Sequence, residues 1–443
     1  MGAAPRRHPI EVVADVARRV ASSDTVDRRG RVSRVTEGRV EVRGLHVRHG
    51  EMLSIDGFAG PVLAQVIAVT PSGAVAALFD VSEGLGQGDE VHTIDDPPVR
   101  VSPSLLGRVI DALGRPLDDK GPIVGERVEL RNERPNPLRR SRIEHPLSTG
   151  VRVIDVMTPL ARGQRMGLFG GSGVGKSTLL GMMARGVDSD LNVVALIGER
   201  GREVREMIED ELGPEGMART VVVVATSDEP AIMRRRAGEL AVRLCEYFAD
   251  AGSDVTLFFD SLTRLAMAER ELGLAAGEPP TARGYTPSVF ALLPALLERT
   301  GPRERGSVTG LFTVLVDGDD MNDPIADSAR SILDGHIVLD RRLAHQGRYP
   351  AIDPLASISR LAASTSQAED LEVAAVLRSV LAAVEDVRDL VEVGAYVPGT
   401  NPVADMGLLI EGDVKDLLGQ RPDDLTPAAE ARERARSIVE RVG

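Results

Sequence analysis

The stretch Arg165-Met-Gly-Leu-Phe-Gly-Gly-Ser-Gly-Val-Gly-Lys-Ser-Thr-Leu-Leu180 decides the fold of this chain. It fits the pattern G-x-x-x-x-G-K-[ST], which starts at Gly170 and ends at Lys176 and Ser177. The apolar residues before the glycines predict a buried strand, and the helix-forming residues after the lysine predict a helix. This order of strand, loop and helix is the context that a phosphate-binding loop requires, and it disfavours the alternative of a Gly-rich turn before an ordinary helix.

A loop of this kind binds a polyphosphate because its backbone N–H groups turn inward and the next helix adds a partial positive charge. We expect Lys176 to contact the β- and γ-phosphates and the hydroxyl of Ser177 to help hold Mg²⁺. The chain has 53 Lys and Arg residues, of which only three are lysines. A lysine kept here indicates that a compact ammonium is needed, since a guanidinium fits this place badly. The loop residues predicted to bind nucleotide are Gly171, Ser172, Gly173, Val174, Gly175, Lys176, Ser177 and Thr178.

Length and composition restrict the class of protein. With 443 residues and 42% apolar residues, the chain should fold as several domains. Its net charge of −14 argues against a general nucleic-acid binder. The single cysteine, Cys245, excludes a disulfide within the chain and fits a reducing compartment. Because the sequence shows neither an apolar run that could cross a bilayer nor a secretory signal, we expect a cytoplasmic protein.

The residue patterns divide the chain into four segments. Residues 1–27 include a short amphipathic helix predicted at 9–21. Residues 28–98 consist of short β-branched runs between glycine turns, which is typical of a small antiparallel β-barrel or sandwich. Residues 99–362 alternate apolar strands with helices, which predicts a parallel sheet covered on both faces. Residues 363–443 keep only helical runs, and therefore predict a helical C-terminal domain.

Two carboxylates follow predicted strands, at the edge where parallel sheets bind their ligands. Glu199 comes after the strand at 192–197 and could act as a general base that orients a water against the γ-phosphate. Asp260 comes after the strand at 254–259 and is a candidate Mg²⁺ ligand. The structural alternatives are a helix cap or a salt bridge to Arg202 for Glu199, and a cap of the next helix for Asp260.

Taken together, these motifs resemble the catalytic subunits of rotary-type ATPases. Within that group, the chain is most similar to the flagellum-specific ATPase of the protein export apparatus and its virulence-secretion relatives. The resemblance spans about residues 100 to 400 and is most specific in the segments 283–290 (RGYTPSVF) and 349–360 (YPAIDPLASISR). It implies a multidomain fold with an N-terminal β-barrel, a central α/β RecA-like P-loop NTPase domain with a mainly parallel sheet, and a C-terminal α-helical domain. The chains would form a homohexameric ring with ATP between neighbours.

The resemblance also implies the roles of individual residues. One subunit would contribute the catalytic residues Lys176, Glu199, Arg200 and Asp260, and its Ser177 and Asp260 would hold Mg²⁺, partly through water. Arg360, which lies beyond the last predicted strand at 336–339, matches the arginine that the adjacent subunit supplies to the γ-phosphate. Tyr349 matches the aromatic residue that stacks on adenine, and Tyr396 is a candidate for the far wall of that pocket. Since an arginine supplied across an interface contributes on the order of 10³–10⁵ in rate, hydrolysis should depend on assembly.

The function that the resemblance implies is Mg²⁺-dependent ATP hydrolysis that powers protein export. The expected partners are further copies of the chain, stalk or regulator proteins, export-gate proteins and chaperone–substrate complexes, without nucleic acid. The protein would be cytoplasmic and peripherally attached to the inner-membrane export apparatus. The wording Gly-Ser-Gly-Val-Gly of the loop favours flagellar over virulence-type export.

Three other interpretations stay open. A rotary ATP synthase catalytic subunit is disfavoured because the C-terminal domain is shorter than in the synthase, while Glu199 favours a catalytic over a non-catalytic subunit. An RNA-translocating hexamer would need a basic, aromatic-rich N-terminal domain, whereas this acidic chain has 3% aromatic residues. The third is a nucleotide-sensing ring without turnover.

Overall fold

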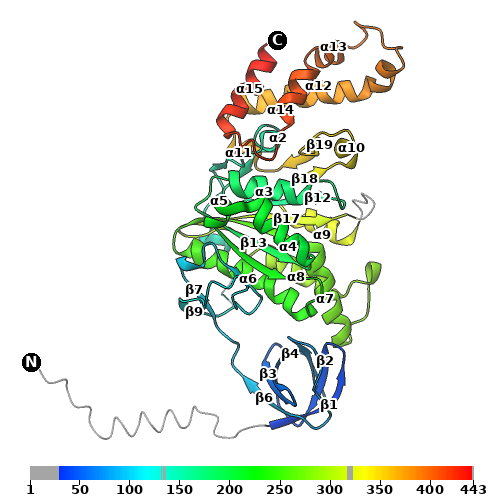
Figure 1. Ribbon diagram of the computed structural model, residues 1–443. Helices are drawn as coiled ribbons and strands as arrows, with labels where there is room; N and C mark the ends of the chain where they lie inside the picture. The colour runs from blue at the N-terminus through cyan, green and yellow to red at the C-terminus, as the bar shows by residue number, and fades with distance from the viewer. Residues whose placement is uncertain (1–28, 131, 133–135, 317–322, 442–443) are drawn as a thin grey trace, which may run out of the picture. The chain divides into compact units, whose positions relative to one another are not determined.

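The computed structural model describes residues 29–130, 132, 136–316 and 323–441 of the chain. These residues fall into two compact units, one ending at Asp96 and the other beginning at Pro97. Figure 1 labels many of the helices and strands of both units. The helix expected at residues 9–21 lies outside the described residues, and the expected domain boundaries after residues 27, 98 and 362 stay predictions.

The first unit contains a closed antiparallel β-barrel in the strand order β1-β2-β5-β4-β3-β6. Its strands are β1 (Arg29–Thr36), β2 (Arg39–Arg43), β3 (Met52–Gly57), β4 (Gly60–Thr70), β5 (Gly73–Leu78) and β6 (Glu90–Ile94). Along β2, Val40 and Val42 are buried while their neighbours are not, which is the period of two that a half-buried strand requires. The barrel, and not the sandwich, is therefore the form that these β-branched runs adopt.

The second unit is built on a nine-stranded sheet in the order β19-β18-β12-β17-β15-β13-β14-β8, with β16 paired to β17. The strands are β8 (Val109–Ile110), β12 (Arg165–Gly170), β13 (Leu191–Ile197), β14 (Thr220–Ala225), β15 (Asp254–Asp260), β16 (Gly301–Pro302), β17 (Ser307–Leu315), β18 (Gly335–Leu339) and β19 (Ile352–Ser359). All pairings are parallel except β16 with β17 and β18 with β19. The predicted mainly parallel sheet is confirmed.

Helices cover both faces of this sheet, as a parallel sheet requires. One face carries α6 (Ala231–Asp250), α7 (Leu262–Ala276), α8 (Pro287–Leu297) and α9 (Pro324–Ile332). The other face carries α3 (Lys176–Gly186), whose Met182 and Met183 pack in one core cluster with Val194 and Leu196 of β13. Every residue of β13 is buried, so this strand lies at the centre of the unit.

Shorter elements connect the main ones. They are β7 (Val99–Val101), β9 (Glu126–Val128), β10 (Pro146–Leu147), α2 (Arg152–Met157), β11 (Leu160–Ala161), α4 (Gly201–Glu206), a π-helix (Met207–Leu212), α5 (Gly213–Ala218) and α10 (Arg341–His345). Strand β7 pairs with β9, and β10 pairs with β11, in two small antiparallel sheets.

The C-terminal segment is helical, as expected from its sequence. Its helices are α11 (Ala362–Thr365), α12 (Ala368–Glu392), α13 (Pro402–Leu409), α14 (Glu411–Leu418) and α15 (Ala428–Glu440). The buried side chain of Arg152 in α2 holds this segment to the sheet: it donates hydrogen bonds to the carbonyl oxygens of Leu417 and Gly419 and to the carboxylate of Asp424. Within the described part of the chain, no helix combines the length and the apolar character that a membrane crossing needs.

Candidate active site

The phosphate-binding loop joins β12 to α3 at the carboxyl edge of the sheet. Gly173 and Gly175 have φ angles of +79° and +89°, a region that favours glycine because a side chain would be strained there. At Gly170 an added β-carbon would lie 2.9 Å from the side chain of Leu339, so β18 packs directly against the loop. The loop therefore presents backbone, and not side chains, at the N-terminus of α3, which is the geometry that binds an anion.

Three of the predicted residues meet beside this loop. The Nζ of Lys176 lies 2.6 Å from Oδ1 of Asp260 and 3.9 Å from Oε1 of Glu199. Lys176 comes from the start of α3, Glu199 follows β13 and Asp260 ends β15, so neighbouring elements deliver them to one point. The structure adds Thr313 of β17, whose hydroxyl donates to Oδ1 of Asp260 over 2.7 Å. The sequence alone did not single out Thr313 as a site residue, because threonine is common inside strands.

Glu199 has an unusual acidity. Burial, and then the negative charge of Asp260, raise its pKa from 4.5 to about 7, although the ammonium of Lys176 opposes the shift. Among the described residues, Oε1 of Glu199 is buried without a hydrogen-bond partner. A carboxylate with a free acceptor atom and a pKa near neutrality is suited to take a proton from a polarised water.

Glu203 is a site residue that the sequence did not reveal as such. A side-chain hydrogen bond joins Glu199 to Glu203, and it raises the pKa of Glu199 while it lowers the pKa of Glu203. Glu203 also accepts from the backbone N–H of Arg200 over 3.3 Å. The only signal was its position four residues after Glu199, at the start of a helix. The guanidinium of Arg200 is exposed and lies 3.9 Å from Glu203, so the predicted catalytic role of Arg200 stays a prediction.

The other predicted loop residues differ in what their side chains offer. Ser177 is exposed in the first turn of α3, so its hydroxyl is accessible to a ligand. Thr178 donates its hydroxyl to Glu211 over 2.7 Å, which leaves its backbone N–H for a phosphate. Hydroxyl and carboxylate oxygens, such as those of Ser177 and Asp260, are the donors that Mg²⁺ accepts. No group of three or more His, Cys, Asp or Glu that could hold a metal ion occurs in the described ranges.

Tyr349 lies over the start of α3. A β-carbon added at Gly175 would be 3.5 Å from its ring, and 46% of the side chain is exposed. Its carbonyl oxygen accepts from the backbone N–H of Gln420 over 2.8 Å, so the C-terminal segment fixes its backbone. This leaves a flat aromatic face open to solvent beside the loop, as stacking on a base requires. The hydroxyl of Tyr396 donates to Asp405 over 2.8 Å, a contact that does not bear on its predicted role.

Arg360 lies at the opposite edge of the sheet from the phosphate loop. Strand β19 runs antiparallel to β18, and its last residue, Ser359, pairs with Gly335 at the start of β18. Five residue steps along β12 separate that edge from Gly170, which is roughly 17 Å. The guanidinium of Arg360 is exposed and donates to the carbonyl oxygen of Arg330 over 3.1 Å. One chain therefore does not bring Lys176 and Arg360 to the same phosphate.

Two family models match the chain. The ATP synthase alpha/beta family, nucleotide-binding domain, matches residues 150–359. The T3SS EscN ATPase C-terminal domain matches residues 366–435. The first match spans the phosphate loop and most of the nine-stranded sheet, and the second spans the C-terminal helices.

Curated relatives match over most of their length. The chain is 46% identical over 410 residues to the flagellum-specific ATP synthase of Bacillus subtilis (strain 168), covering 91% of this chain and 94% of that protein. It is also 46% identical over 417 residues to the type 3 secretion system ATPase of Xanthomonas euvesicatoria, covering 93% and 94%.

Solved structures of type III secretion ATPases also match the chain. The assembled ATPase EscN from the enteropathogenic E. coli type III secretion system matches with a TM-score of 0.88 at 39% identity, covering 93% of this chain and 100% of that chain. EscN in complex with its central stalk EscO matches with a TM-score of 0.85 at the same identity and coverage.

Proposed function

The chain belongs to the type III secretion branch of the ATP synthase alpha/beta family, and from this membership we infer that it hydrolyses ATP to power protein export through a flagellar apparatus. It is an ATPase of type III export, and its hexameric state follows from the assembled EscN that it resembles. One observation supports the catalytic assignment most directly. Beside the phosphate loop, carboxylate oxygens of Glu199 and Asp260 both lie within 3.9 Å of the Nζ of Lys176.

In the proposed reaction, the loop amides and Lys176 bind the β- and γ-phosphates of ATP. Glu199 orients the attacking water and accepts its proton, a role suited to its raised pKa. Bound Mg²⁺, held by Ser177 and by Asp260 partly through water, would neutralise charge on the phosphate oxygens. Tyr349 stacks on the adenine through its exposed face.

We propose that each site is completed by Arg360 of a neighbouring subunit. The support is topological: β19 carries Arg360 to the edge of the sheet opposite the chain's own loop, where its guanidinium is exposed. A guanidinium offered to a γ-phosphate stabilises the charge of the transition state. Because one chain type supplies both Glu199 and Arg360, a ring of identical subunits needs no second kind of chain.

The further partners and the location are proposals. EscN was solved with its central stalk EscO, and we propose a stalk protein as a partner of this chain too, together with export-gate proteins and chaperone–substrate complexes. Membership in an export apparatus would place the protein at the cytoplasmic face of the inner membrane. The assignment to flagellar export rests on the amino-acid sequence of the phosphate loop. Loss of flagellin secretion and motility on deletion of the gene would support it, and loss of effector secretion with intact motility would contradict it.

Phosphate release measured over a range of protein concentrations tests the proposed function. With Mg²⁺ and ATP, activity per subunit should rise steeply with concentration, because each site needs a neighbour. Lys176→Ala should lower it on the order of 10²–10³-fold, as expected for losing one preorganised donor. Lys120→Ala, which removes an exposed ammonium bonded to the carbonyl of Gly107, is the matched control and should change activity less than about twofold. Constant activity per subunit down to monomer concentrations would contradict the proposal.

The raised pKa of Glu199 predicts the pH dependence. Because kcat/KM follows the ionisation of the free enzyme, it should rise with pH and reach half of its plateau near pH 7, and at pH 6 it should lie roughly tenfold below the plateau. Glu203→Gln removes a neighbouring charge that raises this pKa, so the acidic limb should move to lower pH. A wild-type limb centred near the ordinary value of 4.5 would show that Glu199 is not the base.

A further inference from the structure

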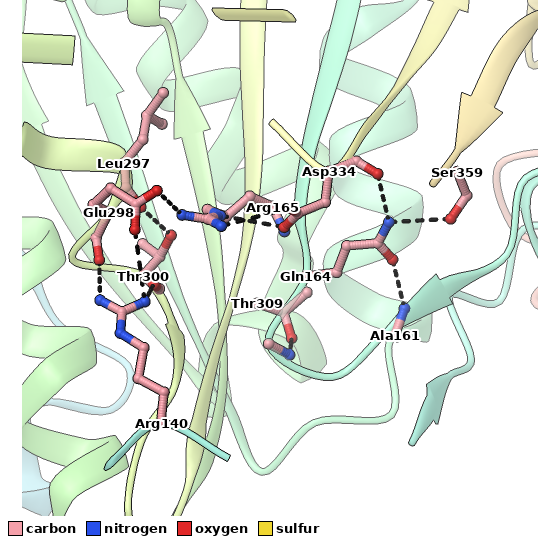
Figure 2. A network of polar contacts seen from close by, with 11 residues as sticks. Arg140, Ala161, Gln164, Arg165, Leu297, Glu298, Thr300, Thr309, Asp334 and Ser359 are labelled. Atoms are coloured by element: carbon pink, nitrogen blue, oxygen red, sulfur yellow. Dashed lines mark hydrogen bonds and ion pairs between the residues drawn. The ribbon is translucent and has the colours of Figure 1, made fainter. Parts of the chain in front are cut away.

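A polar network lies at the edge of the sheet that carries Arg360, and Figure 2 shows it from close by. Gln164, just before β12, is fully buried. Its Nε2 donates to the carbonyl oxygen of Asp334 over 3.2 Å and to the hydroxyl of Ser359 over 3.0 Å, while its Oε1 accepts from the backbone N–H of Ala161 over 2.9 Å. Both N–H groups of the amide and one lone pair are thus used, so the network fixes a single orientation of this side chain.

The carbonyl oxygen of Asp334 is where the network meets Arg360. It accepts from Gln164 and also from the backbone N–H of Arg360, over 2.9 Å. The carboxylate of Asp334 in turn accepts from the backbone N–H of Arg165 over 3.0 Å and from its Nε over 3.2 Å. Arg165 also forms an ion pair with Glu298 at 2.6 Å. The hydroxyl of Ser359 and the backbone N–H of Arg360 are therefore both linked to Gln164, directly in the first case and through the carbonyl oxygen of Asp334 in the second.

Close packing between β18 and β19 also restricts the position of the end of β19. Gly335, the residue after Asp334, has a φ of +155°, and a β-carbon there would lie 2.4 Å from the carbonyl oxygen of Ile358. Strands β18 and β19 thus approach each other more closely here than a side chain would allow. The end of β19 cannot shift toward β18, and Gln164 holds it from shifting away.

We propose that Gln164, together with Asp334 and Ser359, positions Arg360 for the active site of the neighbouring subunit; this inference rests on the proposed function. The arginine side chain is long and flexible, so its guanidinium reaches a fixed place only if its backbone is fixed. Gln164 is a positioning residue: it acts through Asp334 and Ser359, and in its own chain it lies at the edge opposite the phosphate loop. A displacement of about 1 Å in a catalytic constellation costs up to 10²-fold in rate, which makes such anchoring worthwhile.

The competing explanation is that Gln164 supports β12, and through β12 the phosphate loop of its own chain. The two roles act on different sites in the ring, because the loop serves its own subunit and Arg360 serves the neighbour. Mixing of variant subunits therefore separates them. The variant Gln164→Met keeps a similar volume and removes both donated hydrogen bonds.

The experiment measures phosphate release by Gln164→Met alone and in 1:1 mixtures with Glu199→Gln or Arg360→Ala subunits. Alone, Gln164→Met should lose roughly 10–10²-fold in kcat. With Glu199→Gln subunits, which retain a well-held Arg360, activity should recover at up to about a quarter of the sites of a head-to-tail ring. With Arg360→Ala subunits it should not recover, because neither chain then supplies a well-placed arginine.

Recovery with Arg360→Ala and not with Glu199→Gln would overturn the inference in favour of phosphate-loop support, and full activity of Gln164→Met alone would overturn it as well. A mixture of Glu199→Gln with Arg360→Ala that recovers no activity would instead refute the shared site itself, and hence the proposed function. If Gln164→Met does not fold or assemble, Ser359→Ala, which removes one bond of the network, replaces it and should lose several-fold in kcat with the same pattern of rescue.

Thr309→Val is the matched control. Thr309 is buried in the same layer and accepts from the backbone N–H of Gly163 over 2.8 Å, as Figure 2 shows. The change removes one buried hydrogen bond next to Gln164 without touching Asp334 or Ser359. It should lower the stability to unfolding by about 1 kcal/mol. Its kcat should stay within about twofold of wild type, and a loss equal to that of Gln164→Met would contradict the proposal.

Discussion

Glu199→Gln should lower the turnover of ATP by roughly 10²–10⁴-fold, the range that a positioned general base contributes. Glutamine keeps the size of the side chain but does not accept the proton of the attacking water. Since the amide carries no charge, the loss of the 3.9 Å contact with Lys176 is an electrostatic change only, and ATP binding should persist. Steady-state phosphate release gives the turnover, and equilibrium binding of a fluorescent ATP analogue gives the affinity.

The control for this change is Glu206→Gln at the end of α4, the helix that follows Glu199. Glu206 is exposed and lies 3.5 Å from Arg202 in a surface ion pair, so its amide variant should keep its turnover within about twofold. Turnover of Glu199→Gln within threefold of wild type would show that another group activates the water. Loss of ATP binding would instead show that Glu199 contributes to binding the substrate and not only to the chemical step.

Arg360→Ala should lower turnover by roughly 10³–10⁵-fold, as expected for an arginine supplied across an interface. The side chain is exposed and makes one hydrogen bond within its own chain, to the carbonyl of Arg330, so folding should be little affected. Phosphate release gives the turnover, and thermal unfolding together with size-exclusion chromatography reports the fold and the ring. Arg434→Ala, which removes an exposed guanidinium paired with Glu430 on α15, should retain full turnover.

Mixing of variant subunits distinguishes an active site formed by two subunits from one formed within a single subunit. Arg360→Ala subunits keep Glu199, and Glu199→Gln subunits keep Arg360, so a mixed ring contains some interfaces with both groups. Equal mixing should restore up to about a quarter of the sites, whereas each variant alone stays idle. A mixture no more active than its components, with rings still formed, would mean that Arg360 acts elsewhere.

Much of this architecture could be predicted from sequence because the deciding signals are local. The phosphate loop is a contiguous motif, and its strand and helix are the ones that the residue pattern predicts. Glu199 and Asp260 could be singled out because a parallel sheet gathers the carboxyl ends of its strands at one edge, and the structure does bring both to Lys176. Their roles in the reaction stay predictions.

What the sequence did not reveal depends on pairing between distant segments. Strand β19 was not expected, since Pro354 and several polar residues interrupt its apolar pattern, and the prediction that the sheet ends at 336–339 was wrong. That strand is an edge strand, where proline is tolerated. The bond from Thr313 to Asp260 spans 53 positions, and the bonds from Gln164 to Asp334 and Ser359 span 170 and 195 positions, so no local pattern in the sequence indicates them.

Strand β19 has two unlike ends. It begins just after Tyr349, beside the chain's own phosphate loop, and it ends just before Arg360, roughly 13 Å further on when measured along its partner strand β18. On the proposed assignment, the start of β19 would lie beside the chain's own nucleotide, and its end would present Arg360 to the nucleotide of one neighbour. Head-to-tail contacts keep all subunits equivalent and still give each one a distinct left and right. Strand β19 would thus connect each pocket to the next one in the same direction around the ring.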